Sequence, residues 1–160
     1  QQAINELADQ GLDLFDRNYI AVANTRPEKF TVSYMQQFER KMQPLLDRFI
    51  QQRPEFIYAV AVDKNGYLPA HHRHLSQPLS GDYEVDILKS RHQKIYNANR
   101  AEQRRAANLE PFLLQTCIRD TGEILNDLSL PIYINGKHWG GLIMGFKPEC
   151  LLDKGDRSES

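Results

Sequence analysis

The sequence predicts an α+β fold, in which a five-stranded antiparallel sheet carries covering helices and follows a long N-terminal helix. Apolar residues recur every three or four positions over 27–52, which is the pattern of an amphipathic helix. Four later stretches are rich in aromatic and β-branched residues, as strands are: 56–62, 111–119, 124–134 and 138–146. Asn-Gly pairs at 65–66 and 135–136 favour tight turns between antiparallel neighbours.

Length and composition indicate one globular domain. A chain of 160 residues has room for one ordinary core, and 41% hydrophobic with 26% charged residues argues against a disordered or fibrous protein. The net charge of -1 gives no overall attraction to nucleic acid, so we expect no nucleic-acid partner. No apolar run reaches the ~20 residues that cross a bilayer. The chain starts abruptly within a helical pattern, which indicates a piece of a longer protein.

Residues 1–55 are predicted to form a helical segment that packs on, or leads into, the rest of the domain. Residues 1–10 have the apolar spacing of a helix, and Gly11 is suited to end it. After an irregular connection, the long helix over 27–52 contains Pro44. Proline removes one helical hydrogen bond and crowds the preceding turn, so we expect a bend there.

Residues 56–147 are predicted to form the core, and 148–160 a polar tail. The core opens with a hairpin, in which the turn 63–66 joins the strand 56–62 to the short strand 67–69. The crossing to the last three strands contains two weak helical stretches, 82–96 and 100–109. Short turns make adjacent strands antiparallel, which argues against a parallel, doubly wound enzyme fold.

Three of the five histidines cluster at His71, His72 and His74. A cluster of imidazoles could hold a metal ion, and a single one could hold haem iron. The spacing lacks a second His or Cys group at an interval typical of a metal site, so we expect no cofactor. In the alternative interpretation, these side chains bond to the backbone of a polar loop.

Motifs of catalysis are absent from the sequence, and we expect a protein that is not an enzyme. There is no nucleophile elbow, phosphate-binding loop, dinucleotide fingerprint or zinc-protease motif. Cys117 lies in an apolar strand pattern, where a thiol usually packs as a small hydrophobe. Cys117 and Cys150 are expected to be buried or free thiols.

A basic stretch in the crossing segment contains one candidate for anion recognition. Most of its charges are expected to face solvent, but Arg91 has apolar neighbours on both sides, which indicates partial burial. A buried guanidinium suits a carboxylate or a phosphate. Nearer the C-terminus, Gly140 and Gly141 next to Trp139 would let a ligand or another backbone approach closely.

Several blocks resemble the PAS/Cache-like sensory domain of bacterial methyl-accepting chemotaxis proteins. The resemblance covers about residues 8–147 and is carried by residues 62–71, 111–116 and 131–142, with an earlier segment at 14–30. It implies the sheet described above and a sensory role. It also implies a cytoplasmic domain of a membrane-associated receptor, with a periplasmic location as the alternative. The chain departs from the family pattern at 98–101 and 117–118, so its ligand can differ.

We therefore predict a sensory module of a chemotaxis receptor, in which a small molecule lies between the sheet and the segment 71–109 and shifts the signalling state. The expected partners are this ligand, the rest of the receptor's signalling region and, in the full receptor, a second copy. The predicted ligand-binding residues are Tyr67, His71, Arg91, Tyr96, Gln115, Lys137 and Trp139. A haem or metal sensor, and a protein-interaction module without a ligand, remain the alternatives.

Overall fold

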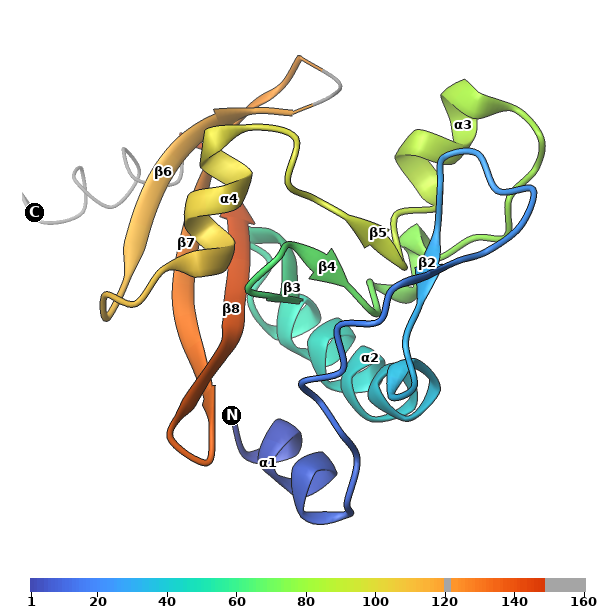
Figure 1. The fold of residues 1–160 in the computed structure, drawn as a ribbon. Coiled ribbons are helices and arrows are strands. Elements are labelled where there is room, and N and C mark those ends of the chain that lie inside the picture. The colour runs from blue at the N-terminus through green and yellow to red at the C-terminus, as the bar shows by residue number, and fades with distance from the viewer. Residues whose placement is uncertain (120–121, 149–160) are drawn as a thin grey trace, which may run out of the picture.

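The computed structural model describes residues 1–119 and 122–148 and contains a twisted antiparallel sheet, whose strands β6, β7 and β8 lie at the left of Figure 1. Its strand order is β3-β8-β7-β6. The bounds of these strands are Phe56–Asp63, Lys137–Phe146, Ile124–Ile134 and Leu113–Ile118. The predicted α+β class with antiparallel strands is confirmed. The predicted tail from residue 149 onward, Cys150 included, lies outside the described residues.

The fifth predicted strand, β4 (Tyr67–Leu68), leaves this sheet. It forms a separate two-stranded sheet with β5 (Lys94–Ile95), so the prediction of one helix over 82–96 was wrong at its C-terminal end. The Tyr96 amide also donates to the Gly66 carbonyl, and these inter-strand bonds outweigh the helical pattern there. The helix itself, α3 (Tyr83–Lys89), is short and begins at an Asp82 side chain that accepts from the Glu84 amide.

The long N-terminal helix begins later than the sequence pattern predicted. It is α2 (Met35–Gln52), and Pro44 lies inside it. Residues 30–31 instead form β2 (Phe30–Thr31), which pairs with β1 (Ile20–Ala21). The Phe30 amide also donates to the Gln93 carbonyl over 2.8 Å. A helix starting at residue 27 would lose these bonds. The predicted first helix is confirmed as α1 (Gln2–Asp9).

Helices lie on both faces of the sheet (Figure 1). The packing of α1 and α2 on one face forms the larger core, which includes Phe38 and Trp139. The short helix α4 (Arg100–Ala107) packs over the other face, against a smaller apolar cluster around Val60 and Ile143. One further 3₁₀ turn, η1 (Arg73–Leu75), follows β4. Within the described ranges, no helix is both long and apolar enough to cross a membrane.

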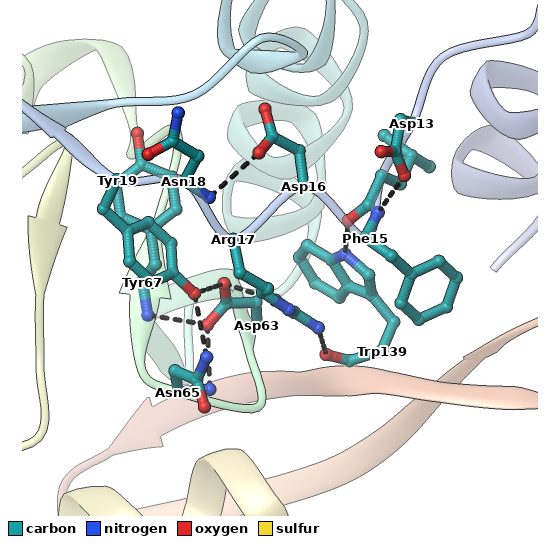
Figure 2. A network of polar contacts seen from close by, with 11 residues as sticks. Asp13, Phe15, Asp16, Arg17, Asn18, Tyr19, Asp63, Asn65, Tyr67 and Trp139 are labelled. Carbon is teal, nitrogen blue, oxygen red and sulfur yellow. Dashed lines mark hydrogen bonds and ion pairs between the residues drawn. The ribbon is translucent and has the colours of Figure 1, made fainter.

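A buried carboxylate, Asp63, helps to fasten the connection from α1 to α2 to the sheet, together with hydrogen bonds between this connection and Trp139 (Figure 2). Arg17 forms an ion pair with Asp63, and the Tyr19 hydroxyl donates to it. The other carboxylate oxygen accepts from the amides of Asn65 and Tyr67, over 2.9 and 3.0 Å. Asp63 therefore joins this connection to the turn between β3 and β4.

Candidate functional site

A cavity of about 350 Å³ lies between the sheet and the crossing segment, on the face covered by α4. The sheet supplies side chains from β3, β6 and β7, and the segment from His71 to Arg105 closes the opposite side. Its lining consists of Tyr58, Val60, Leu68, His71, Arg91, Tyr96, Ala98, Asn99, Ala101, Glu102, Arg105, Cys117, Ile118, Arg119 and Asp127. The predicted location of the ligand site, between the sheet and the segment 71–109, thus contains a cavity.

On the sheet side of the cavity, the carboxylate of Asp127 on β7 contacts several of the other lining residues. It is only 1% exposed, and its carboxylate accepts from the Tyr58 hydroxyl and from Arg105 Nη1, the latter over 2.8 Å. Burial opposes the charge of Arg105, but Asp127, Tyr58 and Glu102 together outweigh this effect and raise the pKa of Arg105. The Cys117 thiol donates to the same carboxylate over 3.3 Å. Burial and Asp127 raise the pKa of Cys117 to about 12, so at neutral pH it is a protonated thiol.

Hydrogen bonds to the sheet hold α4 over the cavity. The Ser129 hydroxyl donates to the Arg105 carbonyl over 2.7 Å, and Gln115 Nε2 donates to the Ala101 carbonyl over 3.0 Å. The Asn99 side chain begins the helix by accepting from the Glu102 amide. Because contacts from two strands fix α4, the guanidinium of Arg105 is held in place above the sheet.

The third side of the cavity comes from the crossing segment. Arg91 is 8% exposed, as the sequence predicted, and its Nε donates to the Leu88 carbonyl over 3.0 Å. The Tyr96 hydroxyl donates to the Arg91 carbonyl over 3.2 Å. His71 is almost fully buried, and burial followed by the neighbouring His72 and Arg91 lowers its pKa well below the usual value. The cavity therefore contains a neutral imidazole beside a buried guanidinium.

Of the seven predicted ligand-binding residues, the structure brings together His71, Arg91 and Tyr96 at this cavity. Gln115 does not line this cavity, and its side chain is bonded to α4. Lys137 is exposed, with its ammonium 4.4 Å from the centre of the Phe15 ring. These two side chains are outside the cavity because the first supports α4 and the second lies at the distant hairpin of β7 and β8.

Tyr67 and Trp139 belong to the core on the opposite face. The Tyr67 hydroxyl donates to the Phe30 carbonyl over 2.8 Å. The Trp139 indole N–H donates to the Leu14 carbonyl over 2.7 Å, and its ring stacks on Phe38. Both rings are fully buried because each polar group finds a backbone acceptor.

Apart from Arg91, sequence reasoning missed the charged residues that line the cavity. Arg119 has the same strand parity as Gln115, so alternation along the strand would have suggested it once the inward face was known. Asp127 interrupts an apolar strand pattern, and a carboxylate there is a signal of a buried partner. Arg105 gave no such signal, because the sequence does not distinguish it from the exposed Arg104.

The histidine cluster is occupied with protein contacts. His72 is fully buried and contacts Asp47 and the Ala59 amide, and His71 Nδ1 accepts from the His72 amide. Outside the cluster, His92 contacts the ammonium of Lys29. Across residues 1–119 and 122–148, no three His, Cys, Asp or Glu side chains are placed to hold a metal ion. The expectation of no cofactor stays a prediction.

Stability should fall when the buried histidines are protonated. Burial lowers the pKa values of His71 and His72, and burial with Lys29 lowers that of His92 to about 4. In the unfolded chain the histidines have pKa values of about 6.5, so between this pH and the lowered pKa values the unfolded chain binds more protons than the folded one. Stability is therefore full above pH ~6.5 and decreases toward pH 4. We expect His92 alone to account for about 2 kcal/mol of the loss.

Urea unfolding at pH 7 and pH 4.5 measures this loss. His92→Asn should reduce the difference between the two pH values, whereas His74→Gln, at an exposed position, should leave it unchanged. Equal stability of the wild type at both pH values would contradict the assignment of neutral buried histidines.

Comparison with known proteins gives similarity of structure only. No family model matches the sequence, and no curated protein matches it. The sensor domain of DcuS from E. coli aligns with a TM-score of 0.49 at 15% identity, over 98% of this chain and 99% of that one. An extracellular ligand binding receptor from Desulfohalobium retbaense aligns with a TM-score of 0.47 at 13% identity, over 92% of this chain. The chain spans 24% of the length of that receptor.

Both similar structures are sensory or ligand-binding domains by description. The predicted cytoplasmic location is contradicted, because the receptor from Desulfohalobium is described as extracellular. The resemblance that implied the cytoplasm concerned the sensory blocks of the sequence, and those blocks do not distinguish the two sides of a membrane.

Proposed function

We propose that this domain is the sensory module of a chemotaxis receptor, and that a small organic anion binds in the cavity beneath α4. Binding favours one packing of the segment 71–109 and so shifts the signalling state of the receptor. The partners are the ligand, the receptor's signalling region and, in the full receptor, a second copy of the chain.

The observation that carries this proposal is the cavity itself. Its volume of about 350 Å³ is within the range of small-molecule sites, and its lining combines apolar side chains with a larger number of polar and charged ones. Three guanidinium groups line it, of which Arg105 is paired with Asp127 and Arg119 with Glu123. His71 adds no positive charge, since its pKa is lowered. A guanidinium donates two parallel hydrogen bonds to a carboxylate, so an arginine-lined cavity favours a ligand that carries one.

Isothermal titration calorimetry with acetate, pyruvate, succinate and glycine tests the proposal, with methylammonium as a cationic control. At least one carboxylate should bind, and methylammonium should not. Arg91→Gln should weaken binding about tenfold or more, since hydrogen bonds to charged groups contribute about 1.5–3 kcal/mol. Arg104→Gln removes the same charge from an exposed residue of α4 and should leave affinity nearly unchanged.

A failure of every carboxylate to bind would contradict this function and favour a protein-interaction module. Equal effects of the two arginine variants would contradict the cavity as the site, because a general charge effect would then explain both.

We further propose that the domain acts without catalysis and without a bound cofactor. The high pKa of Cys117 argues against a nucleophilic thiolate, and both ring nitrogens of His72 have protein partners. An absorption spectrum and metal analysis of the purified protein test whether a cofactor is bound. A Soret band that disappears in His71→Ala would overturn it in favour of a haem sensor.

A further inference from the structure

The dipeptide His71–His72 connects the cavity to the helix on the other side of the sheet. The His71 side chain lines the cavity, whereas the His72 side chain lies between β3 and α2. Both residues are buried, with exposures of 5% and 0%. Two neighbouring side chains of one buried segment thus reach separate layers of the fold.

The hydrogen bonds of His72 fix its orientation. Its Nε2 accepts from the Ala59 amide over 3.0 Å, so the proton of the neutral ring is on Nδ1. Nδ1 then donates to Asp47 Oδ1 over 2.8 Å. The imidazole therefore caps a backbone amide of β3 and holds a carboxylate of α2 at the same time.

A second side chain of α2 holds the same dipeptide. Gln43 Nε2 donates to the His71 carbonyl over 3.0 Å. Gln43 and Asp47 are four residues apart, so they extend from one face of the helix. Any displacement of the dipeptide must either move α2 or break these bonds.

The two imidazoles are also coupled to each other. The His72 amide donates to His71 Nδ1 over 2.7 Å, which leaves the ring proton of His71 on Nε2. If a ligand rotates the His71 ring to meet this donor, the amide of His72 loses its acceptor. Because a buried amide without an acceptor is unfavourable, a movement of the segment that gives the His72 amide a new acceptor then lowers the free energy.

We propose that occupancy of the cavity is transmitted to α2 through the His71–His72 dipeptide, with Gln43 and Asp47 as its attachment points on the helix. This inference rests on the proposed function, since it concerns the ligand that binds there. Coupling of this kind is reciprocal, so a change at Asp47, outside the cavity lining, must alter ligand affinity as well.

The single tryptophan provides the readout. Trp139 lies outside the cavity lining and stacks on Phe38 of α2 with ring centres 5.7 Å apart. A shift of α2 against the sheet changes this contact and hence the emission of Trp139. Fluorescence therefore follows α2, while calorimetry follows binding.

Both measurements are made on the wild type and three variants, with the carboxylate that binds in calorimetry as the probe. Wild-type emission should change and saturate over the same concentrations as binding. Asp47→Ala should lose most of the emission change and alter the Kd by about fivefold or more. Asp47→Asn keeps an acceptor for His72 and should restore part of the response. Gln51→Ala, one turn further along α2 at an exposed position, should behave as the wild type.

Circular dichroism establishes that each variant is folded, and if Asp47→Ala is not, Asp47→Asn alone should show a reduced response. Binding with no change in emission, or a full response in both Asp47 variants, would overturn the coupling and leave the proposed function standing. If none of the carboxylates bound, both the coupling and the proposed function would be contradicted.

Discussion

Replacement of Asp63 by alanine should lower the free energy of unfolding by about 3–5 kcal/mol, because it leaves the buried end of Arg17 without its counter-charge. The loss also deprives the Tyr19 hydroxyl and the amides of Asn65 and Tyr67 of their acceptor. The connection between α1 and α2 should then be held less firmly to the sheet, where its bonds to Trp139 remain. Urea denaturation with parallel hydrogen exchange measures both effects.

The control is Asp9→Ala, which removes a carboxylate at the exposed end of α1. It should change stability by about 0.5 kcal/mol or less. If Asp63→Ala cost no more than Asp9→Ala, the network in Figure 2 would not be what fastens the N-terminal connection.

Gly140→Ala should destabilise the protein by about 3 kcal/mol or prevent folding, because there is no room for a methyl group. A Cβ at this position would overlap the Val62 carbonyl oxygen and lie 2.6 Å from the Asp63 Cα. These are backbone atoms of the paired strand β3, so relief would require β3 and β8 to separate. Thermal melting by circular dichroism measures the effect.

Gly81→Ala is the matched control. Gly81 has a positive φ of 94°, but nothing lies within 4 Å of the added methyl group. It should cost about 1 kcal/mol, from backbone strain alone. A similar loss in both variants would mean that the close approach of β3 and β8 is not what requires glycine at position 140.

The glycines beside Trp139 correctly indicated a close approach to the backbone, but they did not indicate which part of the molecule approaches. The sequence predicts close approach at Gly140, by a ligand or by another backbone. The structure places the backbone of β3 there, and Trp139 in the core. Only the pairing of Gly140 with Asp63, 77 residues away in the chain, decides between the two, and that pairing is not visible in the hairpin's own residues.

For the same reason, the sequence predicted only some of the residues that line the cavity. Apolar neighbours correctly indicated the burial of Arg91, since burial of a side chain follows the immediate pattern of residues. Arg105 and Asp127 were missed because their ion pair joins α4 to β7, and neither segment indicates the other.

The sequence by itself determined the antiparallel strands, the turn at Asn135–Gly136 and the amphipathic helix over most of its length. These features depend on residues close together in the chain, as the positive φ angles of Asn135 and Gly136 illustrate. Only the tertiary structure decided that β4 pairs with β5, that α2 begins at Met35, and which side chains share the cavity. Each of these outcomes depends on hydrogen bonds and burial between distant segments, whose free energy exceeds the local preference.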